Sequence, residues 1–196
     1  MGVSRRHGQK VFASEAFTTV LRRKATNMDS QQLRDLQAPL KQKYREQPEA
    51  ARATLSAKGE LDLENVSCRL QGRGETVAAG LHPLAGGDEK WACSGEMLLE
   101  ALAACAGVTL CAVVTAMDLP VTAGTVVASG DIDFTGTLGV DRTAPVGLTD
   151  VRVHFELETT ADDAQLAKLA QLTERYCVVA QTISAGGAIG VAVTKT

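Results

Sequence analysis

The amino-acid sequence predicts an α+β fold in which antiparallel sheets surround one long apolar helix. Three observations support this prediction. The run from Ser94 to Met117 is the longest apolar stretch and has few polar side chains. Stretches in which apolar and polar residues alternate, which is typical of short strands, lie on both sides of it. Asp162 and Asp163 open an amphipathic segment that predicts a further helix near the C-terminus.

The central helix is apolar on every side, so it belongs either to a protein core or to a membrane. Ser94 is its predicted N-cap, and the helix ends at Asp118. Alanine is its commonest residue and no Lys or Arg anchors it, so we expect a core helix and no membrane. Small side chains spaced by four form one ridge and predict close packing against a second helix: Ala103, Gly107, Cys111 and Thr115.

Length and composition allow one domain with an extension, because 196 residues, 45% of them hydrophobic, can bury a sizeable core. The formal charge of −3 argues against non-specific binding of nucleic acid. No basic, apolar and small-residue secretory pattern opens the chain, so we expect a thiol-reducing, cytoplasmic location. The five cysteines are therefore expected to be packing residues, redox residues or both.

The chain divides into three predicted parts. Residues 1–28 hold six basic residues and one acidic residue, which predicts a disordered extension, with a targeting presequence as the alternative. Residues 29–49 form an N-terminal helical segment, with a helix over Asp29–Gln47 that Pro39 interrupts or kinks. Residues 50–196 form the main domain.

Strands are expected on each side of the central helix. Before it, we expect strands at Ala51–Ala57, Asn65–Gln71 and Glu75–Leu81, and after it at Val121–Ser129, Asp131–Thr137 and Val151–Thr159. A helix from Asp162 to Tyr176 and a last strand from Ala188 to Thr194 complete the domain. These strands cannot cover every side of the central helix, so we expect a homodimer with twofold symmetry.

Two motifs carry a resemblance to a known family. They are GEMLLEALAAC, residues 95–105, and, after a strand-rich stretch, ERYCVV, residues 174–179. Over about residues 50 to 196 the chain resembles the OsmC/Ohr family of thiol-dependent peroxidases. The resemblance implies an intertwined homodimer, with two long helices side by side and sheets from both chains around them. It also implies that Cys105 is the peroxidatic cysteine and Cys177 the resolving one, although Val178 stands where the family usually has proline.

A thiol in the middle of a helix cannot use that helix's N-terminus to lower its pKa, so a cation is required. The resemblance implies an arginine from the N-terminal strands, held by a glutamate just before the central helix. Arg73 is our first candidate, Arg69 is the alternative, and Arg52 lies in the same region. Glu96 is the matching acid, and it can act only from outside the helix or across the dimer.

The expected chemistry is attack by the Cys105 thiolate on an organic hydroperoxide, followed by a disulfide with Cys177 that an external dithiol reduces. The alternative is a non-catalytic OsmC-like dimer that binds an apolar ligand or a partner, with structural cysteines only. Cys93 is an alternative resolving thiol, whereas Cys111 is expected to pack. A cysteine hydrolase or transferase would lack a histidine base.

We expect no metal site and no cofactor. The three histidines are scattered along the chain, and no CxxC or HxxxH spacing is present. The glycine pairs Gly86-Gly87 and Gly186-Gly187 lack the strand-to-helix context of a phosphate loop.

Overall fold

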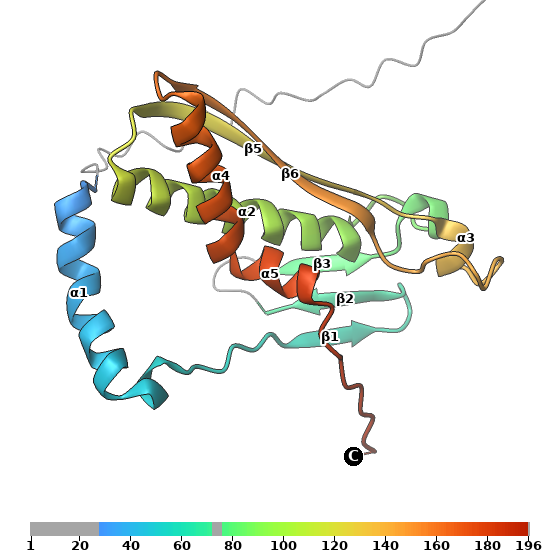
Figure 1. The fold of residues 1–196 in the computed structure, drawn as a ribbon. Helices are drawn as coiled ribbons and strands as arrows, with labels where there is room; N and C mark the ends of the chain where they lie inside the picture. Colours follow the sequence, from blue (N-terminus) through green and yellow to red (C-terminus); the bar gives the residue numbers. More distant parts are fainter. Residues whose placement is uncertain (1–27, 72–75, 196) are drawn as a thin grey trace, which may run out of the picture.

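The computed structural model describes residues 28–71 and 76–195 as an α+β fold (Figure 1). Residues 1–27, which hold nearly all of the predicted basic extension, lie outside the described residues. The helices are α1 (Ser30–Glu46), α2 (Ser94–Met117), α3 (Phe134–Thr137), α4 (Asp163–Tyr176) and α5 (Val178–Ala185), with 3-10 turns at Pro48–Ala51 and Pro83–Ala85. The strands are β1 (Gly59–Asp62), β2 (Ser67–Leu70), β3 (Val77–Gly80), β4 (Ala92–Cys93), β5 (Val121–Asp131) and β6 (Thr149–Thr159).

The strands form two separate sheets. One has the order β1-β2-β3-β4, in which β1, β2 and β3 are antiparallel and the two-residue β4 runs parallel to β3. The other is the long antiparallel pair β5-β6. In Figure 1 the β5-β6 pair arches over one side of α2, while β1, β2 and β3 lie on the other side.

Helix α2 begins one residue earlier than the predicted cap implies. Its N-cap is Cys93 rather than Ser94, because the Glu96 carboxylate accepts a hydrogen bond from the Cys93 backbone N–H at 3.1 Å. The helix ends as predicted at Asp118, which takes the left-handed conformation (φ 53°) before Leu119 and Pro120.

One side of α2 forms the core with the long sheet and with α4. Its buried residues are Leu102, Ala106, Leu110 and Val113. Leu110 and Val113 pack with Leu119 and with Leu169 of α4, while Leu102 and Ala106 pack with Cys177. Figure 1 shows α4 crossing α2. Helix α2 therefore contacts α4 on one part of its core face and α5 on another.

The remaining surface of α2 is uncovered in the single chain. Helix α2 is long and apolar enough to cross a membrane. Of its most apolar 18-residue window, 22% is buried inside the chain. Within the predicted small-residue ridge, Gly107 faces β5, since a Cβ there would lie 3.6 Å from Val126 Cγ1, whereas Cys111 is exposed. The exposed stripe runs instead along Ala101, Ala104, Val108 and Cys111.

Helices α4 and α5 meet at a single residue. Asp162 and Gln165 form a capping box that starts α4, close to the predicted boundary at Asp162. Cys177 is both the C-cap of α4 and the N-cap of α5. The sequence analysis missed α5, in which Val179, Ala180 and Ile183 share one helical face and pack on the core around Cys177.

Two of the predicted strands are misplaced. The first was expected at Ala51–Ala57, but residues 52–58 are irregular and β1 lies at Gly59–Asp62, where the β1-β2 register pairs Gly59 with Leu70. The segment Asp131–Thr137 was also expected to be a strand. Instead β5 continues to Asp131, and the Asp133 carboxylate then accepts from the Thr135 N–H and starts the short helix α3.

Two further expectations differ from the structure. Of the two effects expected of Pro39, interruption of the helix does not occur, because α1 runs unbroken from Ser30 to Glu46. The last predicted strand, Ala188–Thr194, is irregular in the single chain, where Ile189, Val191 and Val193 are exposed.

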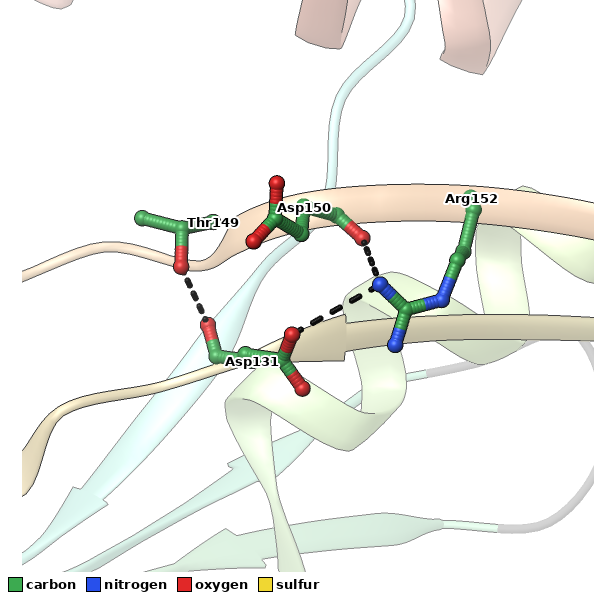
Figure 2. A network of polar contacts seen from close by, with 4 residues as sticks. All are labelled: Asp131, Thr149, Asp150 and Arg152. Atoms are coloured by element: carbon green, nitrogen blue, oxygen red, sulfur yellow. Dashed lines mark hydrogen bonds and ion pairs between the residues drawn. The ribbon is translucent and has the colours of Figure 1, made fainter.

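Polar contacts hold the loop end of the β5-β6 pair, where residues 132–148 join the two strands (Figure 2). The Thr149 hydroxyl donates to the Asp131 carbonyl at 3.3 Å, opposite it in the register. Arg152 Nη1 donates to the Asp150 carbonyl at 3.1 Å and lies 3.6 Å from Asp131 Oδ2. All of these side chains are exposed, so we expect them to set the strand ends and to add little stability.

Candidate functional site

The structure brings Cys105 and Cys177 together. Cys105 lies in the middle of α2, on the helix face that meets α5, and is half-buried. Cys177 lies at the α4–α5 junction and is only 1% exposed. The two side chains pack against each other, and both are free thiols. Two cysteines separated by 72 positions in the sequence therefore share one site.

The environment of Cys105 favours the thiolate. Burial by itself raises the pKa of the Cys105 thiol. Hydrogen bonds from the Val179 N–H, the Cys177 thiol and the Val178 N–H outweigh burial, so the pKa lies below its usual value. Val178 and Val179 are the first two residues of α5, where backbone N–H groups have no partner within the helix. The sulfur of Cys105 is thus held at the positive end of α5.

The pKa of the Cys177 thiol is shifted in the opposite direction. Burial is the main cause that raises the pKa of the Cys177 thiol, and its contact with Cys105 adds to the increase. A hydrogen bond from the Ala180 N–H opposes these effects without cancelling them. The pair can therefore hold one negative charge on Cys105 and one proton on Cys177.

Thr109 also contacts Cys105 from the next turn of α2. Its hydroxyl donates to the Cys105 backbone carbonyl at 2.7 Å. It also lies within hydrogen-bonding reach of the Cys105 sulfur and helps to lower the thiol pKa.

Of the proposed activating residues, the structure describes Arg69 and Glu96, and neither is among the groups that shift the pKa of Cys105. Arg73 lies in residues 72–75, outside the described residues. Arg69 is exposed on β2, opposite Glu60 in the β1-β2 register, and its charge lowers the pKa of Asp62. Glu96 caps α2 and forms no ion pair among the described residues.

The other cysteines lie elsewhere. Cys93 caps α2, and the twelve residues to Cys105 correspond to roughly 18 Å along a helix, so the two cannot pair within one chain. Cys68 lies on β2, and Cys111 is on the exposed stripe of α2. In residues 28–71 and 76–195, no group of three His, Cys, Asp or Glu side chains could hold a metal ion.

The sequence analysis did not anticipate the backbone N–H groups of Val178 and Val179. The available signal for them was Gly186, in the glycine pair that precedes the predicted last strand. Gly186 takes the left-handed conformation (φ 56°) and caps the C-terminus of α5. An apolar stretch that ends in such a glycine is also typical of a short helix.

Comparison with protein-family models identifies the family of this chain. A family model described as OsmC-like protein matches residues 87–191, which include α2, the long sheet, α4 and α5. The chain belongs to the OsmC family. The matched region contains both Cys105 and Cys177. No curated protein sequence matches this OsmC-family chain.

Solved structures resemble the protein in fold. An OsmC-like protein from Mycoplasma pneumoniae has a TM-score of 0.56 at 16% identity, over 67% of this chain and 88% of that one. An OsmC-like protein of unknown function from Vibrio cholerae has a TM-score of 0.52 at 17% identity, over 67% and 94% of the two chains. A hypothetical protein from Aquifex aeolicus has a TM-score of 0.52 at 16% identity, over 68% and 89%. At these identities the likeness concerns the fold alone.

Proposed function

We propose that this OsmC-family protein is a thiol-dependent peroxidase that reduces organic hydroperoxides. Cys105 is the attacking thiolate and Cys177 is the resolving thiol. The observation that carries the proposal is the contact between these two thiols, with the pKa of Cys105 lowered and that of Cys177 raised. A structural cysteine pair has no need for such a difference, whereas a nucleophile and its resolving partner do.

The first step is a two-electron oxidation of Cys105. Its thiolate attacks the outer oxygen of the hydroperoxide, so that an S–O bond forms and the O–O bond breaks. The inner oxygen leaves with the bonding electrons, takes up a proton and departs as the alcohol. Cys105 becomes a sulfenic acid.

The second step uses Cys177. Its sulfur attacks the sulfenic sulfur of Cys105, an S–S bond forms, the S–O bond breaks and water leaves. Because Cys177 is in contact with Cys105, this step needs no large movement of the helices. An external dithiol then reduces the disulfide by thiol–disulfide exchange and is itself oxidised.

The start of α5 supplies part of the charge stabilisation that this mechanism requires. The N–H groups of Val178 and Val179 hydrogen-bond the Cys105 sulfur and favour its ionised form. The family resemblance implies an arginine in addition, for which Arg73 remains the candidate, with Glu96 as the acid that holds it. Arg69 is a weaker candidate, because it faces the acidic residues of β1.

The surroundings of Cys105 favour an organic hydroperoxide over hydrogen peroxide. Cys105 packs against a cluster that contains Leu102, Ala106 and Val179. An alkyl group leaving water for this surface gains roughly 0.8 kcal/mol for each buried CH₂ group. Hydrogen peroxide has no alkyl group and gains nothing from it.

We also propose that the active form is the intertwined homodimer, with two α2 helices side by side. The supporting observation is the uncovered stripe of small and apolar residues on α2, in which Val108 is 73% exposed. Apolar residues of the other sheet, such as Leu61 and Val77, are exposed as well. A second copy would cover both surfaces, and a twofold dimer is the commonest way to do so.

The alternative function is a non-catalytic OsmC-like dimer that binds an apolar ligand. One observation favours it, namely an apolar cavity between α2, β6, α4 and α5. In that case Cys105 and Cys177 would be packing residues, and peroxide would not be consumed.

The direct test is the consumption of cumene hydroperoxide with dithiothreitol as reductant. Cys105→Ser removes the nucleophile and should abolish consumption. Cys68→Ser is the control, because it changes a cysteine of β2 that lies outside both the cysteine pair and the exposed α2 stripe, and it should retain activity. Activity in Cys105→Ser equal to that of the unchanged protein would exclude the proposed function.

A further inference from the structure

A cavity of about 330 Å³ lies next to the cysteine pair, between α2, β6, α4 and α5. Its walls are mostly alkyl and aromatic, with Leu102, Val153, Phe155 and Ala180 among them. Cys177 forms part of the wall, whereas Cys105 is not among the described residues that line it. Among the described residues, the cavity therefore borders the resolving thiol and not the attacking one.

One polar group in this cavity is unusual. Thr173 of α4 is 5% exposed and lines the cavity, and its hydroxyl oxygen has no hydrogen-bond partner among the described residues. Leaving a buried hydroxyl unpaired costs about 1–3 kcal/mol, so native proteins rarely do it without a reason.

Other helical threonines in this protein satisfy their hydroxyls. Thr109, Thr115 and Thr182 each donate to the backbone carbonyl four residues earlier, at 2.7, 2.9 and 2.8 Å. Thr173 could make the same bond to the Leu169 carbonyl within its own helix, but it does not. Its hydroxyl is thus available to a molecule in the cavity.

The chemistry of the cavity restricts what it can bind. Its volume is at the lower end of the range for small-molecule sites, and a dry cavity of about 150 Å³ already accepts benzene. Among the described residues that line it, Glu174 alone has a formal charge, and both Glu174 and Ser184 are exposed. These two residues place an opening at the surface between α4 and α5. An acidic residue at that position disfavours anions, and the apolar walls disfavour cations.

We propose that this cavity is a binding site for a small, uncharged, largely apolar molecule that pairs one oxygen atom with the Thr173 hydroxyl. The site goes beyond the peroxidase function, since it neither contains Cys105 nor requires redox chemistry. Alcohols and ketones with a ring or a short alkyl chain have the matching chemistry.

The test uses a pair of probes that differ by one hydroxyl, benzyl alcohol and toluene. Binding to the full-length reduced protein is measured by ligand-observed NMR titration. We expect both probes to bind, with benzyl alcohol favoured over toluene after correction for their different solubility in water. Valine has nearly the same shape as threonine, so Thr173→Val should weaken the binding of benzyl alcohol by about fivefold and leave the binding of toluene unchanged.

Three variants control the result. Thr182→Val removes a helical hydroxyl that does not line the cavity, so the preference for benzyl alcohol should remain. Thr173→Ser keeps a hydroxyl and should retain the preference. Ala180→Leu fills the cavity and should abolish the binding of both probes.

The proposal is overturned if neither probe binds, if Thr173→Val leaves the affinity for benzyl alcohol unchanged, or if Ala180→Leu leaves both affinities unchanged. These outcomes do not depend on peroxidase activity, because no step of the experiment involves peroxide. Failure of the cavity proposal can therefore be distinguished from failure of the proposed peroxidase function.

Discussion

The Cys105 side chain packs against the buried Cys177 side chain, and the pKa of the Cys105 thiol is lowered while that of the Cys177 thiol is raised. Cys177 is also the residue at which α4 ends and α5 begins. Because of this position, the α4–α5 junction brings the second thiol to Cys105 and also directs the first N–H groups of α5 at the same sulfur. Five predictions follow from this geometry and from the fold around it.

The first prediction concerns pH. The pKa of the Cys105 thiol lies below its usual value and that of Cys177 above it, so just below the usual thiol range a larger fraction of Cys105 than of Cys177 is ionised. Iodoacetamide at such a pH should modify Cys105 well before Cys177, as read by peptide mass spectrometry. Equal modification of both residues would contradict the assigned roles.

The same shifts affect stability. The folded protein binds fewer protons at Cys105 than the unfolded chain does between the folded and unfolded pKa values. Cys105 therefore adds stability above its unfolded pKa, and this contribution is lost as the pH falls through its folded pKa. The raised pKa of Cys177 has the opposite effect on stability. Its contribution is fully present below the unfolded pKa and is lost as the pH rises through the folded pKa.

The second prediction concerns the start of α5. Val178→Pro removes one N–H donor to the Cys105 sulfur, and it should raise the pKa of that thiol by about one unit, since hydrogen bonds to charged groups contribute about 1.5–3 kcal/mol. Proline suits this first helical position, and Cys177 before it is extended (φ −72°, ψ 106°). Val178→Ala keeps the N–H and is the control.

The pKa in both variants is measured from the pH dependence of Cys105 alkylation. An alkylation midpoint that is the same in Val178→Pro and Val178→Ala would show that the α5 N-terminus does not stabilise the thiolate. Peroxidase activity could still persist in that case, supported by an arginine.

The third prediction separates the two roles of Cys177. Cys177→Ser and Cys177→Ala both prevent the disulfide, so the Cys105 sulfenic acid should accumulate and be trapped by dimedone. The serine hydroxyl can still donate a hydrogen bond to the Cys105 sulfur, whereas the alanine methyl cannot. The Cys105 alkylation midpoint should therefore lie higher in Cys177→Ala than in Cys177→Ser.

The fourth prediction concerns assembly. Val108→Glu places a charge in the exposed stripe of α2, so it should weaken a homodimer built on α2 by at least about tenfold in sedimentation equilibrium. Val127→Glu is the matched control, because Val127 is an exposed valine of β5, opposite His154. If both variants dimerise as strongly as the unchanged protein, the contact between two α2 helices is excluded.

The fifth prediction concerns the core. Leu169 of α4 is 2% exposed and packs on Leu110 and Val113, so Leu169→Ala should lower the free energy of unfolding by about 2–5 kcal/mol. Leu55 is exposed and lies outside any helix or strand, so Leu55→Ala should change the free energy of unfolding by less than about 0.5 kcal/mol. Urea denaturation measures both, and equal effects would contradict the described core.

The parts of the fold that depend on local signals could be predicted from the sequence. Helix α2 follows from a long apolar run and a clear stop at Asp118, and β6 from strict alternation. Helix α4 follows from its acidic N-terminus and its periodic leucines. In each case the residues that determine the element lie within it.

Elements that depend on a distant partner were predicted less well. The segment Ala51–Ala57 alternates like a strand, but the β1-β2 register places the strand at Gly59–Asp62. Helix α5 has β-branched residues that favour strands, yet its apolar face packs on the core around Cys177 and makes it helical. Tertiary contacts outweigh local preference in both segments.

The candidate site divides in the same way. Cys105 and Cys177 were chosen from motifs, and the structure places them in contact. The N–H groups of Val178 and Val179 could not be chosen, because any residue except proline has an N–H and only the position of α5 makes these two significant. The same holds for the unpartnered hydroxyl of Thr173, which no sequence pattern distinguishes from Thr182.

The central claim, that Cys105 is oxidised and Cys177 resolves it, is tested most directly by peptide mapping after oxidation. The reduced protein is treated with one equivalent of cumene hydroperoxide, blocked with an alkylating agent and digested without reductant. We predict a single new species in which the Cys105 peptide is joined to the Cys177 peptide within one chain. Recovery of both peptides fully alkylated, or a disulfide that joins Cys105 to any other cysteine, would contradict the account.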